Sequence, residues 1–158
     1  MTAGKTEDAE AMTIDEFFAG YVAAFNRSLG EQVDAEEIRR HFSPCFVGAG
    51  PLGIQCGQND ASFTEALEQG YAFYRKIGMR AMVVRGITTI PIDDAHTLAR
   101  VAYRASYEKS GGEALDLDFE VSYMLAMQAE TYEVFAFVVG DERALYEQHG
   151  LLPVTDAS

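Results

Sequence analysis

The fold of this chain is decided by residues 115–127, which read LDLDFEVSYMLAM. Large apolar side chains alternate there with polar ones, and three carboxylates, Asp116, Asp118 and Glu120, stand two positions apart. A period of two is typical of a β-strand with one face in the core and the other in solvent. Strand-like patterns also occupy three further segments, so four strands in a row are predicted: 79–90, 96–108, 115–127 and 132–139.

The pairing of two of these strands suggests what the three carboxylates do. If residues 109–113 close a simple hairpin, opposed residue numbers add up to about 222. Arg104 then faces Asp118, and Arg100 lies diagonal to Glu120, so the carboxylates form an ionic outer face and not an acid/base site. Two alternatives stay open, because a bulge would turn one acid inward and a second subunit would cover the outer face. The opposite, helix-facing side carries Val101, Tyr103, Tyr107, Leu115, Leu117, Phe119, Val121, Tyr123 and Leu125.

Helices are predicted before and after the strands. A capping box at 13–16 opens a long amphipathic helix that ends at Gly30. Similar signals at 34–37 and 62–65 open a short second helix and a third helix that reaches residue 77. Gly140 and Asp141 cap a short last helix that ends near residue 150.

The segment 43–60 is rich in glycine and proline. We expect a short strand at 46–47 and irregular structure in the rest of this segment, because both residue types disfavour regular elements. A loop of this length is either a lid or binding loop, or a plain connector.

The order of elements predicts one α+β domain. It runs helix, helix, short strand, helix and a four-strand antiparallel meander, with the helices packed on one face of the sheet. The domain is expected to span 13–152, between a disordered acidic tail at 1–12 and a C-terminal tail at 153–158.

Charge and composition exclude several classes of partner. A net charge of −13 disfavours nucleic acid and anionic membrane surfaces. We expect a cytoplasmic protein, because no secretory signal or membrane-length apolar run is present. Cys45, Cys56 and the scattered histidines give no zinc spacing, and no glycine-rich phosphate motif follows a strand, so neither a metal nor another cofactor is expected.

The same order of elements resembles the nuclear transport factor 2-like superfamily, particularly its polyketide-cyclase (SnoaL-like) and steroid delta-isomerase branch. The resemblance rests on the first helix, TIDEFFAGYVAAFNRSL (13–29), on the long strands, and on VFAFVVGDERALYEQHGLL (134–152). It implies a strongly curved, cone-shaped sheet wrapped around the helices, a pocket at its open end, and homodimerisation through the outer sheet face. The superfamily includes isomerases, dehydratases, epoxide hydrolases, cyclases and binding proteins without activity, so the fold does not select one function.

The catalytic residues of these relatives do not transfer cleanly. An isomerase-like site needs a carboxylate base in the pocket beside a tyrosine donor, but the acids of the central strands are predicted to face outward. A hydrolase-like Asp-Arg-Asp set finds no matching positions. A dehydratase-like set of tyrosines and histidines fits best among the enzymes, and the catalytic candidates are His41, Tyr103 and Tyr123.

We predict two sets of functional residues. The ligand-binding set would line an aromatic, apolar pocket: Phe18, Tyr21, His41, Phe46, Tyr71, Tyr74, Tyr103, Phe119 and Tyr123. In the alternative interpretation His41 caps a helix end and the tyrosines belong to the core, with their hydroxyls bonded to backbone or water. The set on the outer face would form a homodimer interface: Arg100, Arg104, Asp116, Asp118 and Glu120.

These patterns lead to two hypotheses about function. In the first, the protein binds a small apolar organic molecule, with or without cofactor-independent isomerase, dehydratase or hydrolase activity. In the second, it is a non-catalytic dimerisation or interaction domain that acts through the outer face of the sheet.

Overall fold

The structure is a computed structural model, and it describes residues 11–153. The predicted tails at 1–12 and 153–158 lie almost wholly outside the described residues, so the division into tails and domain stays a prediction. The helices and strands, in chain order, are α2 (Ile14–Ser28), α3 (Ala35–Arg39), β1 (Phe42–Gly50), β2 (Gly53–Gln58), α4 (Ala61–Lys76), β3 (Met79–Pro91), β4 (His96–Glu108), β5 (Ala114–Gln128), β6 (Thr131–Val139) and α5 (Glu142–Gln148).

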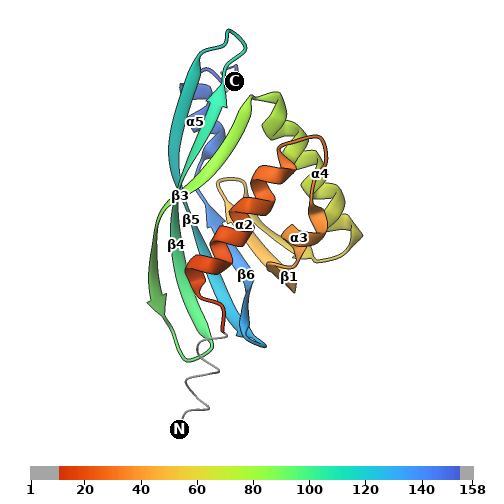
Figure 1. Ribbon diagram of the computed structural model, residues 1–158, viewed down its shortest axis with the longest axis vertical. Helices are drawn as coiled ribbons and strands as arrows, with labels where there is room; N and C mark the ends of the chain where they lie inside the picture. Colours follow the sequence, from red (N-terminus) through yellow and green to blue (C-terminus); the bar gives the residue numbers. More distant parts are fainter. Residues whose placement is uncertain (1–10, 154–158) are drawn as a thin grey trace.

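The strands form one curved sheet, and helices α2, α3 and α4 lie on one side of it (Figure 1). The strand order is β2-β1-β6-β5-β4-β3, so the four long strands are neighbours in the order of the chain. The register shifts between Val84 and Gly86 in β3 and between Met124 and Leu125 in β5. Irregularities of this kind bend strands, which accounts for part of the curvature. The predicted α+β architecture is confirmed.

The register of β4 and β5 is the predicted one. Arg104 pairs with Asp118 and Ser106 pairs with Asp116, so opposed residue numbers add up to 222. Val101, Tyr103 and Leu125 on the helix-facing side are buried. The carboxylates of Asp116, Asp118 and Glu120 are on the exposed, outer side.

The prediction of an irregular segment at 43–60 is wrong. These residues form the hairpin β1–β2, which also joins the sheet by a parallel pairing of β1 with β6, so the sheet is mixed and not wholly antiparallel. Pro44 lies where the β1–β6 register is interrupted. Its missing N–H therefore removes no regular hydrogen bond between these two strands. The glycines permit close contact: a Cβ on Gly48 would lie 2.7 Å from the ring of Phe137.

Two of the predicted helix caps differ in the structure. The capping box of Thr13 and Glu16 is present. Asp34, however, makes no capping bond, because its carboxylate pairs with Arg27 at 2.8 Å. Helix α4 begins one residue before the predicted start, and its cap is Asp60, whose side chain accepts a hydrogen bond from the Ser62 N–H.

The core lies between the helices and the inner face of the sheet. Phe17, Phe18 and Phe25 of α2 are buried there together with Tyr71 of α4 and the inward residues of β4 and β5. Burial of this apolar face stabilises both layers, since about 25 cal/mol is gained for each Å² removed from water. No helix within residues 11–153 is long and apolar enough to cross a membrane.

Candidate functional site

A cavity of about 210 Å³ lies inside the fold, between the helices and the inner face of the sheet. Helix α2 contributes Tyr21 and Phe25, α4 contributes Leu67 and Tyr74, and α5 closes one side with Glu142 and Tyr146. The sheet contributes a floor of large apolar and aromatic side chains: Met79, Met82, Tyr103, Phe119, Val121, Tyr123, Phe137 and Val139. A cavity with these walls suits a small, mainly apolar molecule.

Two buried hydroxyl groups meet at this cavity. The phenol oxygens of Tyr103 and Tyr123 lie 2.7 Å apart, so one hydroxyl donates a hydrogen bond to the other. Burial raises the pKa of both phenols well above the ordinary value, which keeps them protonated. Each hydroxyl carries one proton, and the pair uses only one of them between its own oxygens. The second proton is free to donate a hydrogen bond to a guest in the cavity.

Glu142 is the residue that brings a carboxyl group to this cavity. The side chain of Asp141 accepts a hydrogen bond of 3.0 Å from the Ala144 N–H, which fixes the start of α5 and places Glu142 at its first position. Burial raises the pKa of the Glu142 carboxyl above its ordinary value. By its exposed surface Glu142 is half-buried, at the edge of the cavity.

The negative charge of Glu142 raises the pKa of several of the surrounding tyrosines. Burial raises the pKa of Tyr21 to about 12, and the negative charge of Glu142 contributes to this shift as a second cause. The same two effects raise the pKa of Tyr74 and of Tyr146. The cavity therefore holds one carboxyl group among protonated phenols.

The cavity brings together five members of the predicted ligand-binding set: Tyr21, Tyr74, Tyr103, Phe119 and Tyr123. Phe18 is buried beside it, with its ring centroid 4.9 Å from that of Tyr123. Tyr71 is buried against Phe25 and Tyr74. Neither Phe18 nor Tyr71 lines the cavity.

His41 lies outside the cavity. Its Nδ1–H donates a hydrogen bond of 2.9 Å to the carbonyl oxygen of Glu37, and its ring packs 4.8 Å from that of Phe17. Burial lowers the pKa of the imidazole. This geometry matches the helix-capping interpretation of His41 and leaves it without contact to the tyrosine pair.

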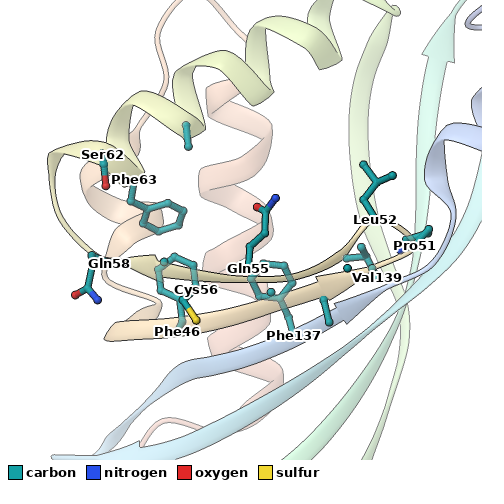
Figure 2. A pocket seen from close by; sticks show the side chains of 16 residues that line it. Phe46, Pro51, Leu52, Gln55, Cys56, Gln58, Ser62, Phe63, Phe137 and Val139 are labelled. Carbon is teal, nitrogen blue, oxygen red and sulfur yellow. The ribbon is translucent and has the colours of Figure 1, made fainter.

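A second, more open cavity of about 470 Å³ lies between the hairpin β1–β2 and helix α4 (Figure 2). Phe46, the remaining member of the predicted set, lines this second cavity and not the inner one. We call the second cavity the hairpin groove.

The five predicted interface residues lie on the outer face of the sheet and are exposed. Asp118 pairs with Arg104 at 2.8 Å and with Arg85 at 3.3 Å, and the Arg104 guanidinium lowers the pKa of the Asp118 carboxyl. Arg100 and Glu120 stand 4.0 Å apart. Asp118 and Glu120 are thus partners of arginines on the outer face, and Asp116 is exposed there beside them, which does not suit an acid/base site.

Sequence reasoning missed Glu142, because it looked for a base only on the central strands. A signal was present: Asp141 as the cap makes Glu142 and Tyr146 an i, i+4 pair on one side of α5. Since Tyr146 is buried, Glu142 on the same side faces inward too. Within residues 11–153, no group of three or more His, Cys, Asp or Glu side chains is placed to hold a metal ion.

The curved sheet and the three helices on its inner side are the features of an NTF2-like fold. A family model described as "NTF2-like protein (DUF6841)" matches residues 8–142, and the chain belongs to this family. The resemblance found from the sequence is confirmed at the level of the superfamily. No curated protein matches this sequence.

Several solved structures share the fold. A protein from Catenulispora acidiphila in complex with S-DNPA is 16% identical, with a TM-score of 0.60 over 93% of this chain and 100% of that one. The protein Aln2 from a Streptomyces species is 14% identical, with a TM-score of 0.61 over 85% and 92%. A ketosteroid isomerase-like protein from Erwinia carotovora atroseptica is 15% identical, with a TM-score of 0.57 over 80% and 92%. Identities this low show the fold alone.

Proposed function

We propose that the protein binds a small apolar carbonyl compound in the inner cavity and moves a proton at the carbon next to that carbonyl, without a cofactor. The observation that carries this proposal is the meeting of two groups in one apolar cavity: the Glu142 carboxyl and the hydrogen-bonded pair of Tyr103 and Tyr123. These are the two parts that such a reaction needs, a base and a hydrogen-bond donor for the developing oxyanion.

Each residue has a defined task in this reaction. The Glu142 carboxylate takes a proton from the carbon beside the carbonyl. The electron pair of that C–H bond forms the new C=C bond, and the π pair of the C=O bond moves onto the carbonyl oxygen. The free proton of the tyrosine pair hydrogen-bonds that oxygen as it becomes negative. Returning the proton to another carbon gives an isomerisation, and loss of a group from the next carbon gives an elimination.

The environment of Glu142 supports this role. A carboxyl with a raised pKa is a stronger base than a fully hydrated one, and partial burial raises the pKa of Glu142. The buried phenols stay protonated and so remain donors. One solved structure with this fold is called ketosteroid isomerase-like, which agrees with proton transfer on a ketone. Another holds a small molecule.

The test is deuterium uptake from D₂O into 2-tetralone, a compact apolar ketone, followed by proton NMR. We expect exchange faster than in buffer. Glu142→Gln is expected to slow it by at least about 10²-fold, because the base is lost. Tyr103→Phe and Tyr123→Phe are expected to slow it by about 10²-fold each.

The matched control is Glu120→Gln, the same chemical change on the outer face of the sheet, and it should leave the exchange rate unchanged. Exchange at the buffer rate with the native protein, or equal exchange in Glu142→Gln, would refute the catalytic role. Binding of 2-tetralone without exchange would leave the protein as a binding protein.

A second proposal concerns the outer face of the sheet, as the interface of a homodimer. What favours it is the mixed character of this face: the exposed apolar side chains of Val83 and Val138 share it with the ion pairs of Arg104 and Asp118. Alternating apolar and complementary charged groups allow the same face of two copies to meet.

Sedimentation velocity tests this second proposal. We expect a dimer for the native protein and a monomer for Asp118→Lys, which places cations against the arginines of both copies. The control Glu65→Lys changes an exposed residue of α4, on the helical side, and should remain a dimer. Unchanged sedimentation of Asp118→Lys would argue against this interface.

A further inference from the structure

The hairpin groove adjoins the inner cavity. Phe63 of α4 and Phe137 and Val139 of β6 line both spaces, so the same three side chains separate them. Figure 2 shows α4 above the hairpin, with the rings of Phe46 and Phe137 below that of Phe63. The inner cavity and the groove are therefore neighbouring spaces.

The groove stays open because its two walls carry small residues. The hairpin presents Gly48, Gly50 and Gly57 where other strands present side chains, and α4 presents Ala66. A Cβ on Gly50 would lie 2.9 Å from the Val139 side chain, and one on Gly57 would lie 2.7 Å from the Phe46 ring. The bare backbone lets these apolar side chains form the floor.

The lining of the groove is mainly apolar, and its outer end is exposed. Leu52 at the hairpin tip is fully exposed, and Figure 2 shows it on the same side of the hairpin as Gln55, whose side chain points toward α4. An apolar chain lying along the groove would cover this leucine and remove its surface from water.

From these contacts we infer that the ligand has two parts: a compact carbonyl head in the inner cavity and an apolar chain that leaves between Phe63 and Phe137 and lies in the hairpin groove. This inference rests on the proposed function, because it assigns the head to the tyrosine pair. The chain is uncharged, since no acidic or basic side chain is among the residues that line the groove. The ligand class is therefore a neutral ketone with a hydrocarbon tail.

The experiment measures dissociation constants by isothermal titration calorimetry for alkyl phenyl ketones, from acetophenone to octanophenone. Each added methylene group that enters an apolar site strengthens binding by about fourfold. We expect this gain along the series for the native protein. Ala66→Leu places a larger side chain in the groove, and it should bind acetophenone as the native protein does but lose the gain for longer chains.

The matched control is Ala72→Leu, the same change at an exposed position of the same helix that does not line the groove. It should keep the full gain. A native series without any gain, or an undiminished gain in Ala66→Leu, would overturn the inference.

The two proposals fail in different ways. If acetophenone binds and exchanges deuterium but longer ketones bind no more tightly, the inference about the groove is refuted and the catalytic role is not. If Ala66→Leu weakens the binding of long ketones but no ketone exchanges deuterium, the inference about the groove is supported and the catalytic role is refuted. No binding of any ketone refutes both.

Discussion

The phenol oxygens of Tyr103 and Tyr123 lie 2.7 Å apart although the two residues are four positions out of register on neighbouring strands. Tyr103 is opposite Phe119 in the ladder, and Tyr123 is opposite Ala99. The two side chains therefore lean toward each other along the strands, above the Val101–Val121 pair that lies between them. This arrangement places two hydroxyls at one point of an otherwise apolar sheet face.

The energetic coupling between the Tyr103 and Tyr123 hydroxyls can be measured from the free energy of unfolding of single and double variants. Tyr103→Phe leaves the Tyr123 hydroxyl without its partner, and we expect it to lower the free energy of unfolding by about 1–2 kcal/mol. Removal of the second hydroxyl as well should cost little more, because no unpaired group is then left. Urea unfolding of both single variants and the double variant, followed by circular dichroism, completes the cycle. Additive losses would mean that the two hydroxyls are energetically independent.

Glu142 is expected to reduce stability at neutral pH. Burial raises the pKa of its carboxyl in the folded protein above the ordinary value of 4.5, so the folded state holds this proton more tightly than the unfolded chain. Stability from this group is present below pH 4.5 and is lost as the pH rises through the folded pKa.

Glu142→Gln should therefore raise the free energy of unfolding at pH 8 and leave it nearly unchanged at pH 4, below the ordinary pKa of the carboxyl, while abolishing deuterium exchange. For a domain of this size, each kcal/mol gained at pH 8 appears as a rise of about 2–4 °C in Tm. Denaturant titrations at the two pH values give the comparison. A variant less stable than the native protein at pH 8 would show that the carboxylate is well solvated.

The sequence was sufficient to predict the structure in those parts of the fold that depend on contacts between residues close together in the chain. The β4–β5 register follows from the short connection at 109–113, where the Gly112 N–H donates to the Lys109 carbonyl at 2.7 Å and the chain turns in a left-handed conformation at Gly112. Alternation of apolar and polar residues then assigns Asp118 and Arg104 to the outer face. Nothing distant in the chain is needed for either step.

The hairpin β1–β2 and the role of Glu142 depend on distant partners, and prediction from the sequence failed for both. Strand β1 has a place in the sheet because β6, some ninety residues later, pairs with it in parallel, and because Phe137 lies against the Cα of Gly48. Glycine at position 48 allows the Phe137 ring to approach the backbone closely. A glycine-rich composition alone does not show whether the glycines allow such a contact in a strand or belong to a loop. The burial of Glu142 likewise depends on where α5 meets the sheet.

His41 is expected to matter for stability and not for activity. His41→Phe keeps a ring against Phe17 but loses the hydrogen bond to the Glu37 carbonyl, at a cost of about 1 kcal/mol at pH 8. Deuterium exchange into 2-tetralone should stay within about twofold of the native rate, because the ring does not reach the cavity. A loss of exchange comparable to that of Glu142→Gln would place His41 in the reaction.

The same variant should alter the pH dependence of unfolding. Burial lowers the pKa of His41 in the folded protein below its ordinary value of 6.5, so the unfolded chain takes up the proton first. The native protein then loses stability as the pH falls below about 6.5, and His41→Phe should lose less between pH 8 and pH 5.5. Identical slopes of stability against pH would show that other groups account for the dependence.

Gly78 joins α4 to β3, and its conformation leaves little room for substitution. Its φ is +92°, and a Cβ there would lie 2.2 Å from the carbonyl oxygen of Glu108. The Glu108 N–H also donates a hydrogen bond of 2.9 Å to the Gly78 carbonyl, so neither strand can move away freely.

Gly78→Ala is therefore expected to lower the free energy of unfolding by about 2–4 kcal/mol, from the left-handed backbone and the contact together. Gly70→Ala is the matched control, because Gly70 lies inside α4 with no atom within 4 Å of the added Cβ. It should instead raise stability by about 0.5–1 kcal/mol through helix propensity. Urea titrations of the two alanine variants give opposite shifts of the midpoint if the connection between α4 and β3 is as tight as described. A Gly78→Ala variant as stable as the native protein would mean that this connection relaxes.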